Sequence, residues 1–347
     1  MEKKIPAAVI GYGLSGKVFH APFLHVHEGF RLKTILTSGE EAQKHYPQVG
    51  VSRSFEDILA DGEIELVAIC TPNKLHFEQA KQALEAGKNI VIEKPVTPGY
   101  EEALKLIEIA ENNDRTIFPY QNRRWDGDFM TVKELISSGR LGRVHNFISH
   151  FDRYVPEIGR AAWRYEGESG GGTLYDLGVH MIDQALVLFG KPKAVFCRLF
   201  TQREGSGNDD AFDLNLIYDD LNVTLKAGVL VRDPGPRFIV HGTKGSFRKR
   251  GLDVQEPQLR QGKMPGDPGF GEEPEEMWGM LTLDDNGTAV KEMVKTRKGY
   301  YMGFYDDVHE SITGGNSPEV TMKQAAINIR VIEMAKRSAE KLKVVGF

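Results

Sequence analysis

Residues Ile5–Gly16 read IPAAVIGYGLSG, and this stretch decides the fold of the first part of the chain. An apolar run, Ala7–Ile10, leads directly into three glycines spaced Gly-x-Gly-x-x-Gly, at Gly11, Gly13 and Gly16. This spacing after a strand is typical of a dinucleotide-binding turn. The first glycine makes the turn, the second leaves room for a pyrophosphate, and the third lets the next helix pack closely. Three glycines can also simply form a turn, so the interpretation depends on the residues that follow.

Those residues, as far as Tyr120, alternate apolar runs with amphipathic stretches. The expected strands are Ala7–Ile10, Leu32–Leu36, Leu66–Ile69, Ile90–Ile92 and Thr116–Phe118. The expected helices are Phe55–Ala60, Leu75–Ala86 and Glu101–Glu111. Continuously apolar strands that alternate with helices predict a parallel sheet covered on both faces. We therefore expect an α/β fold whose residues 1–122 form a doubly wound Rossmann domain.

The second part of the chain has a different pattern. A helix at Phe129–Ser138 precedes a long strand at Val144–Tyr154, and another helix follows the glycine run Gly170–Gly172. The later expected strands are Val195–Thr201, Leu214–Tyr218, Val223–Val229 and Phe238–Val240. Short turns between such strands predict an α+β domain over residues 123–347 with a large, mostly antiparallel open sheet.

Two further segments of this part stand apart. The Gly- and Pro-rich segment Pro257–Glu276 is expected to be a long surface loop of unknown role. The periodic segment Met322–Leu342 is expected to be an amphipathic helix that packs back on the first domain.

Composition excludes several classes of protein. With 347 residues, 40% hydrophobic and 27% charged, the chain is expected to form two globular domains. A net charge of −5 and only one short basic run, Lys244–Arg250, exclude a nucleic-acid partner, and we interpret that run as a solvated turn. Without an apolar leader or a spanning segment, a cytoplasmic protein with no membrane contact is expected. Cys70 and Cys197 are interpreted as reduced core residues, and no metal site is expected.

Two motifs follow strands of the expected parallel sheet. Cys70-Thr71-Pro72-Asn73 lies at the carboxyl end of one strand, where doubly wound folds bind ligands, although the same residues could simply form a turn that caps the next helix. Glu93-Lys94-Pro95 ends the next strand. Pro95 favours an extended backbone at Lys94, which would hold the ammonium group over the ligand edge. A lysine there can stabilise a developing alkoxide, but a lysine at a strand end is more often simply solvated.

The third motif is the segment Gly170–His180, GGGTLYDLGVH. Asp176 and His180 are four residues apart and would share one face of a helix. Histidine titrates near neutral pH and can take the proton of a hydroxyl group while hydride leaves the adjacent carbon. A purely structural Asp–His pair inside the helix is the competing interpretation.

Together the three motifs resemble the Gfo/Idh/MocA oxidoreductase family over essentially the whole chain. The glycine loop, Glu93-Lys94-Pro95 and Asp176-x-x-x-His180 match in order and spacing, and His241–Ser246 is similar to a turn of the family's second domain. Within the family, Gly11–His20 and Asn122–Asp126 look most like the bacterial NADP-dependent scyllo-inositol dehydrogenase branch.

The resemblance implies hydride transfer between a nicotinamide cofactor and a secondary alcohol or ketone of a cyclic polyol or sugar. It implies that Lys94 hydrogen-bonds the reacting oxygen, that His180 is the acid/base, and that Asp176 orients the substrate or the histidine. It also implies a homodimer or homotetramer built through the second-domain sheet. Another sugar, an anhydrosugar or a deoxy-ketose remains an alternative substrate. A dinucleotide-binding sensor without turnover is a more distant alternative, because both Lys94 and His180 are present.

Position alone suggests further substrate contacts. Arg124 and Tyr154 are predicted to bind substrate beside Asp176 and His180. The large aromatic residues Trp125 and Trp163 are weaker candidates, because such side chains are more often core residues.

NADP is predicted to be preferred over NAD, with NAD as the alternative. An NAD-selective fold places an acidic residue about 20 positions after the glycine loop, but Thr37 and Ser38 stand there. Relatives that use NADP often carry a basic residue next, where this chain has Gly39, so Lys44 or backbone N–H groups are expected to hold the phosphate. The predicted cofactor contacts are Gly11, Gly13, Leu14, Ser15, Gly16, Thr37, Ser38, Thr71, Pro72, Asn73, His76, Glu93 and Lys94.

Overall fold

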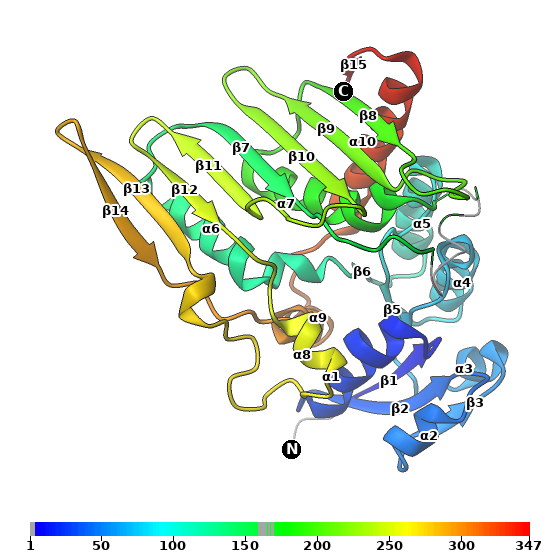
Figure 1. Cartoon of the computed structure of the whole chain (residues 1–347). Coiled ribbons are helices and arrows are strands. Elements are labelled where there is room, and N and C mark those ends of the chain that lie inside the picture. The colour runs from blue at the N-terminus through cyan, green and yellow to red at the C-terminus, as the bar shows by residue number, and fades with distance from the viewer. Residues whose placement is uncertain (1–3, 159–164, 166, 168–169) are drawn as a thin grey trace. The chain divides into compact units, whose positions relative to one another are not determined.

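The computed structural model describes residues 4–158, 165, 167 and 170–347 (Figure 1). The chain divides into two compact units, each built from separate stretches of sequence. Unit 1 comprises Met1–Asn122, Gln255–Phe270 and Tyr300–Ile327. Unit 2 comprises Arg123–Val254, Gly271–Gly299 and Asn328–Phe347.

The sheet of unit 1 is parallel, with its described strands in the order β3-β2-β1-β4-β5-β6. This is the strand order of a doubly wound dinucleotide-binding fold. The strands are β1 (Ile5–Ile10), β2 (Phe30–Leu36), β3 (Gly50–Ser52), β4 (Leu66–Ile69), β5 (Asn89–Ile92) and β6 (Ile117–Pro119). Every residue of β1 and β4 is buried, as the continuous apolar runs require of strands covered on both faces. The predicted α/β fold of this part is confirmed.

The helices of unit 1 begin and end where local sequence chemistry favours it. Ser54 caps α3, and its hydroxyl accepts the backbone N–H of Asp57 at 3.2 Å. Gly87, with a φ of +74°, follows the end of α4, and α4 and α5 pack beside one another (Figure 1). The helical segments are η1 (Gly16–His20), α1 (Ala21–Val26), α2 (Glu41–His45), α3 (Phe55–Ala60), η2 (Asn73–Leu75), α4 (His76–Glu85), α5 (Tyr100–Asn112), α8 (Gln255–Arg260) and α9 (Met302–Gly314).

The sheet of unit 2 is larger, with its described strands in the order β14-β13-β12-β11-β7-β10-β9-β8-β15. Strands β7 and β10 pair in parallel, and the other neighbours pair antiparallel. The strands are β7 (Val144–His150), β8 (Ala194–Phe200), β9 (Ala211–Ile217), β10 (Asn222–Gly228), β11 (Phe238–Gly242), β12 (Gly245–Lys249), β13 (Gly279–Asp285), β14 (Thr288–Val294) and β15 (Val345–Gly346). The predicted mostly antiparallel open sheet is confirmed.

Burial along this sheet alternates. In β8, for example, Val195 and Cys197 are fully buried, whereas Phe196 and Arg198 on the other face are not. The buried face packs against helices, and Ser338 of α10 accepts the N–H of Cys197 at 3.0 Å. The helical segments are α6 (Gly127–Ser137), η5 (Leu174–Gly178), α7 (Val179–Phe189), η6 (Glu275–Met277) and the greater part of α10 (Met322–Lys341). Neither cysteine forms a disulfide, and no described helix is long and apolar enough to cross a bilayer.

The structure corrects the interpretation of the basic run Lys244–Arg250. Its residues 245–249 form β12 instead of a solvated turn. The reason is Lys249, whose side chain is fully buried and whose ammonium nitrogen lies 3.1 Å from a carboxylate oxygen of Glu273. A lysine with a buried partner of opposite charge can lie inside a folded unit, and the partner is distant in sequence.

Other differences concern weakly patterned segments. The segment Pro257–Glu276 is not simply a surface loop, because residues 257–260 belong to α8 and Leu259 and Phe270 are buried. The strand expected over Val144–Tyr154 ends at His150. The hairpin β13–β14, at one end of the sheet in Figure 1, was not predicted, because β14 is exposed along most of its length and shows no apolar alternation.

Candidate active site

The glycine loop has the geometry that its spacing predicts. Gly11 has a φ of +93°, which lets the chain turn directly after β1. A Cβ atom on Gly16 would lie 2.0 Å from the carbonyl oxygen of Gly11, so only glycine permits this close packing. At Gly13 a Cβ atom would meet nothing within 4 Å. The loop therefore has the close turn and the adjoining open space that a pyrophosphate group requires.

Leu14 and Ser15, which lie between Gly13 and Gly16, differ in their exposure and contacts. Leu14 is 48% exposed, whereas the hydroxyl group of Ser15 donates a hydrogen bond to Glu93. Glu93 stands at the end of β5 and is only 8% exposed, and its contacts tie the glycine loop to the segment that carries Lys94. Lys94 is half-buried, and its peptide bond to Pro95 is cis.

The segment after β4 lies at the same edge of the sheet. The hydroxyl group of Thr71 donates to the side chain of Gln79 at 2.6 Å, Pro72 is exposed, and Asn73 is buried at the start of η2. His76 is fully buried, with its ring nitrogens 2.9 Å from the carbonyl oxygens of Pro95 and Thr71. Burial lowers the pKa of His76. The imidazole thus joins the segment after β4 to the segment after β5, and its contact with the cofactor stays a prediction.

The predicted ribose end of the site follows β2. Thr37 accepts the N–H of Gly39 at 3.1 Å through its hydroxyl oxygen, and Ser38 is exposed. The guanidinium group of Arg53 donates to the carbonyl oxygen of Ser38. Arg53 directly follows β3, which pairs with β2 in parallel, so the sheet brings this cation to the Thr37–Ser38 turn. Sequence reasoning missed Arg53, because it lies 15 residues beyond Ser38.

In unit 2, Asp176 and His180 lie in successive helical segments. Asp176 is half-buried in η5, which is a π-helical turn, and His180 is the second residue of α7 and 4% exposed. The expectation of one continuous α-helix is corrected, because the segment begins with the wider π turn. Such turns are rare and occur often at functional sites.

The carboxyl group of Asp209 fixes the entry to η5. It accepts the N–H of Leu174 at 2.8 Å, and a Cβ atom on Gly172 would lie 2.3 Å from its other oxygen. Burial raises the pKa of Asp209 to about 6, although the hydrogen bond from Leu174 and the charge of Lys336 act in the opposite direction. No sequence motif identifies Asp209, because it lies 35 residues beyond Leu174 and reaches the glycine run only through the fold.

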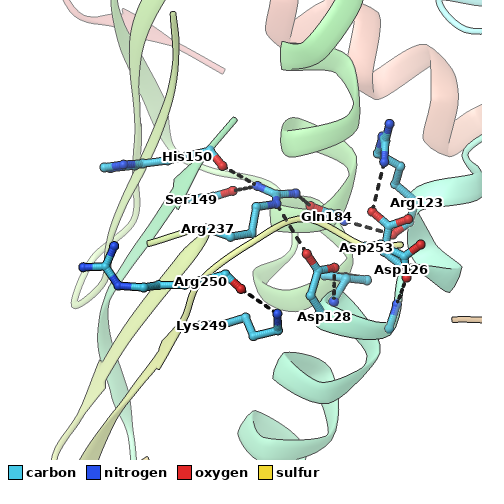
Figure 2. A network of polar contacts seen from close by, with 12 residues as sticks. Arg123, Asp126, Asp128, Ser149, His150, Gln184, Arg237, Lys249, Arg250 and Asp253 are labelled. Carbon is cyan, nitrogen blue, oxygen red and sulfur yellow. Dashed lines mark hydrogen bonds and ion pairs between the residues drawn. The ribbon is translucent and has the colours of Figure 1, made fainter. Parts of the chain in front are cut away.

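The helix α7 is anchored by a buried polar network in unit 2 (Figure 2). The fully buried guanidinium group of Arg237 donates to the side chain of Gln184 at 2.9 Å and to the carbonyl oxygen of His150 at 3.1 Å. It also donates to Ser149, and its Nε lies 3.7 Å from Asp128. Since Gln184 belongs to α7, one turn beyond His180, this network fixes the helix that carries the predicted acid/base.

The two predicted substrate residues have different surroundings. Arg124 is 7% exposed and forms two hydrogen bonds of 2.7 Å with Asp183 of α7, which also accepts from Asn328 at 3.0 Å. Its guanidinium group therefore stabilises α7 from within. Tyr154 is 42% exposed, and the guanidinium carbon of Arg232 lies 3.5 Å from the centre of its ring.

The two tryptophans named beside them give no further support. Trp125 is 8% exposed and is thus a largely buried side chain. Trp163 lies outside the described residues.

Comparisons with known proteins agree with these two units. Residues 5–121 match the family described as "Oxidoreductase family, NAD-binding Rossmann fold", and residues 133–347 match "Oxidoreductase family, C-terminal alpha/beta domain". Both descriptions belong to the Gfo/Idh/MocA family.

Individual relatives match over different lengths. The scyllo-inositol 2-dehydrogenase (NADP(+)) IolW of Bacillus subtilis (strain 168) is 40% identical over 98% of this chain and 95% of its own length. The solved structure of yvaA from Bacillus subtilis has a TM-score of 0.96 and 39% identity, covering 99% of this chain and 98% of that chain. The D-glucoside 3-dehydrogenase of Escherichia coli (strain K12) is 25% identical over 53% of this chain and 54% of its own length. The chain therefore belongs to the Gfo/Idh/MocA family and is an oxidoreductase with an NAD(P)-binding Rossmann domain.

Proposed function

We propose that this protein transfers hydride between NADP and a secondary alcohol or ketone of a cyclic polyol, with scyllo-inositol as the favoured substrate. The observation that carries the proposal is the position of Lys94, which follows β5 at the sheet edge where the glycine loop follows β1. An ammonium group at that edge is suited to a reacting oxygen beside a bound dinucleotide. The similarity to an NADP-dependent scyllo-inositol dehydrogenase over almost the whole chain supports the substrate class.

When bound, the nicotinamide ring supplies the carbon that accepts or donates the hydride. Lys94 donates a hydrogen bond to the reacting oxygen and stabilises negative charge on it. His180 takes the hydroxyl proton in the oxidation and returns it in the reduction. Asp176 orients the substrate hydroxyl or the imidazole ring. Buried contacts of Asp183 and Gln184 hold α7, so the position of His180 is fixed before the substrate arrives.

The chemistry of the turn after β2 supports the preference for NADP. Thr37 and Ser38 provide hydroxyl groups and no carboxylate, so nothing at these positions repels a 2′-phosphate. Arg53 supplies the cation that the sequence lacks at Gly39, and a guanidinium group binds phosphate oxygens in a bidentate manner. Of the nearby acids, Glu41 is paired with Lys17 at 3.2 Å. Arg53 is thus a stronger candidate than Lys44 for the phosphate contact.

A glycoside oxidised at a ring hydroxyl is the second candidate substrate. It is favoured by the partial similarity to a D-glucoside 3-dehydrogenase, which covers about half of each chain. The same machinery would serve, because both substrates present a ring carbon with a secondary hydroxyl group. We also predict a homodimer or homotetramer formed through the half-exposed face of the unit 2 sheet, in the cytoplasm.

The experiment is a screen of scyllo-inositol, other inositols and glucosides with NADP and with NAD, followed by the absorbance of the reduced nicotinamide. We expect the highest kcat/KM for scyllo-inositol with NADP. Faster oxidation of a glucoside would replace the first substrate proposal with the second. No turnover with any polyol or glycoside, in the presence of measurable NADP binding, would contradict the catalytic proposal.

A further inference from the structure

The buried side chains of Glu93, His20 and Tyr305 and the half-buried Ser15 form a hydrogen-bonded chain next to the candidate site of unit 1. Glu93 lies at its centre. One oxygen of Glu93 lies 3.0 Å from Nε2 of His20 and also accepts from Ser15, and the other accepts the backbone N–H of Lys94 at 3.0 Å. On the far side of the imidazole, Nδ1 of His20 lies 2.7 Å from the hydroxyl oxygen of Tyr305. The chain thus runs from α9 through η1 to both the glycine loop and the lysine segment.

The charge balance at Glu93 explains why this carboxylate can be buried. Burial alone would raise the pKa of Glu93, but the hydrogen bonds from His20 and Ser15 and the charge of Lys94 outweigh it, so the pKa is lowered. An ionised carboxyl group can accept all three donors, whereas a protonated one would lose acceptor capacity. His20 therefore contributes to holding Glu93 in the form that binds both loops.

The surroundings of His20 fix its role. The ring is fully buried, as is Tyr305, and the ring of Tyr120 lies 4.2 Å away between centroids. With Nε2 protonated and donating to Glu93, Nδ1 is left to accept from the phenol of Tyr305. The ionised carboxylate can only accept, so it selects the Nε2–H tautomer, and the phenol, which can donate, satisfies the remaining ring nitrogen.

We propose that His20 and Tyr305 are positioning residues, which act through Glu93 to hold Lys94 and the glycine loop in the arrangement that binds the cofactor and the reacting oxygen. This inference rests on the proposed function of Lys94. It assigns Glu93 a role behind the site, because both of its oxygens are engaged with donors of the protein itself. His20 and Tyr305 carry no predicted contact with cofactor or substrate, so their effect on catalysis would be indirect.

The test compares His20→Leu, which removes the donor, with His20→Gln, whose amide can still donate to Glu93. Tyr305→Phe removes only the phenol hydroxyl group that contacts Nδ1 of His20. The matched control is His27→Leu, because Nε2 of His27 lies 3.0 Å from the carboxylate of Asp306, next to Tyr305 on α9, and this pair does not touch Glu93. NADP affinity is measured by titration of intrinsic fluorescence, and kcat and KM are measured on an accepted substrate.

We expect His20→Leu to weaken NADP binding and to lower kcat by about ten- to hundredfold each, the range of a lost hydrogen bond to a charged group. His20→Gln should restore most of both values, and Tyr305→Phe should show a smaller loss of the same kind. His27→Leu should leave both values within about twofold of the parent, since its ion pair is more exposed.

The pH dependence provides a readout that general destabilisation would not move. The groups that face Glu93 are Ser15, His20, Cys70, His76, Lys94 and Tyr305. Burial raises the pKa of Cys70 and of Tyr305 and lowers that of His76, so these three stay neutral near neutral pH. In His20→Leu, protonation of Glu93 should therefore make the loss of NADP affinity larger as the pH falls from about 8 to about 6.

Two results would overturn the proposal. One is NADP affinity and kcat in His20→Leu and Tyr305→Phe equal to those of His27→Leu. The other is a loss in His20→Leu that His20→Gln does not reverse and that does not change with pH. If His20→Leu does not fold, the comparison of His20→Gln and Tyr305→Phe with the control decides. Because NADP binding is measured without substrate, a protein that turns over no polyol would refute the proposed function and leave this test intact.

Discussion

Each unit buries a carboxyl group beside its functional segment, and the two groups behave in opposite ways. In both cases burial opposes ionisation. At Glu93 of unit 1, His20, Lys94 and Ser15 outweigh burial, and the pKa is lowered. At Asp209 of unit 2, burial outweighs the hydrogen bond from Leu174 and the charge of Lys336, and the pKa is raised to about 6.

This difference reflects what each unit does with buried charge. In unit 1 the buried polar groups gather at the ligand edge of the sheet, within the loops that would hold the cofactor. In unit 2 they extend through the interior, where Arg237 and Gln184 fix α7 (Figure 2). Substitutions at the ligand edge of unit 1 should therefore change binding or turnover more than stability, and substitutions in the unit 2 network should do the reverse.

The largest expected effect tests the two predicted reacting groups, Lys94 and His180. Lys94→Ala and His180→Gln should each lower kcat by about 10²–10⁴-fold, the usual contribution of a positioned proton donor or acceptor. NADP affinity should survive in His180→Gln. Steady-state kinetics and fluorescence titration measure both quantities.

Matched controls are Lys105→Ala on the exposed face of α5 and His241→Gln in unit 2, whose imidazole bonds Ser246 at 2.7 Å. Both should keep parental turnover. A His180→Gln variant that retains near-parental kcat would remove this residue from the proposed chemistry.

The second prediction concerns stability in unit 2. Arg237→Met should lower the free energy of unfolding by about 3–5 kcal/mol, because it leaves Asp128 buried without its cationic neighbour and removes a donor from Gln184. Urea unfolding followed by circular dichroism measures the loss. The control is Arg232→Met, an exposed arginine of the same unit, which should cost less than about 1 kcal/mol. Equal losses in the two variants would mean that the buried network contributes little.

The same contrast explains how far the sequence could predict the molecule. In unit 1, strands buried on both faces give continuous apolar runs, and the motifs follow the strand ends. The fold, the geometry of the glycine loop and the place of Lys94 after β5 were therefore predictable. Short motifs identify residues that must be close in sequence. They do not identify Arg53 or Tyr305, which contact Ser38 and His20 only because the sheet or a later helix brings them there.

Unit 2 was less predictable for a related reason. The open sheet was visible in alternating strands, but β14 was not, because an exposed edge strand needs no apolar face. Lys249 was misread as a turn residue, because its partner Glu273 lies 24 positions away. Asp176 and His180 were predicted to lie in one α-helix. The π turn that contains Asp176 was not predicted, because local helix propensity does not distinguish a π turn from an α-helix.

The third prediction tests the behaviour of Asp209 directly. Its pKa in the folded protein, about 6, lies above the ordinary value of 3.8, so the folded state binds the proton more tightly than the unfolded state. Stability should therefore fall as the pH rises from about 4 to about 6, by about 3 kcal/mol in total for this one group. In Asp209→Asn this part of the pH dependence should disappear, since the amide oxygen can still accept from Leu174. The measurement is the urea midpoint of unfolding at several pH values across this range. An equal change of the midpoint with pH in the parent and in Asp209→Asn would contradict the raised pKa.

The smallest predicted effect concerns an exposed residue of unit 1 and tests whether its ligand edge extends to the ribose. Arg53→Ala should lower kcat/KM with NADP by about tenfold, or about 1.4 kcal/mol, and should leave kcat/KM with NAD unchanged. The physical reason is that only NADP carries the 2′-phosphate, which the guanidinium group beside Ser38 is placed to bind.

Arg53→Lys should retain part of the preference, because it keeps the charge but not the bidentate geometry. Lys44→Ala on α2 is the control, since it removes the other nearby cation, and it should have the smaller effect. If Arg53→Ala lowers kcat/KM equally with NADP and with NAD, the arginine supports the turn after β2 and does not select the phosphate. If Lys44→Ala instead produces the selective loss, the phosphate contact belongs to α2.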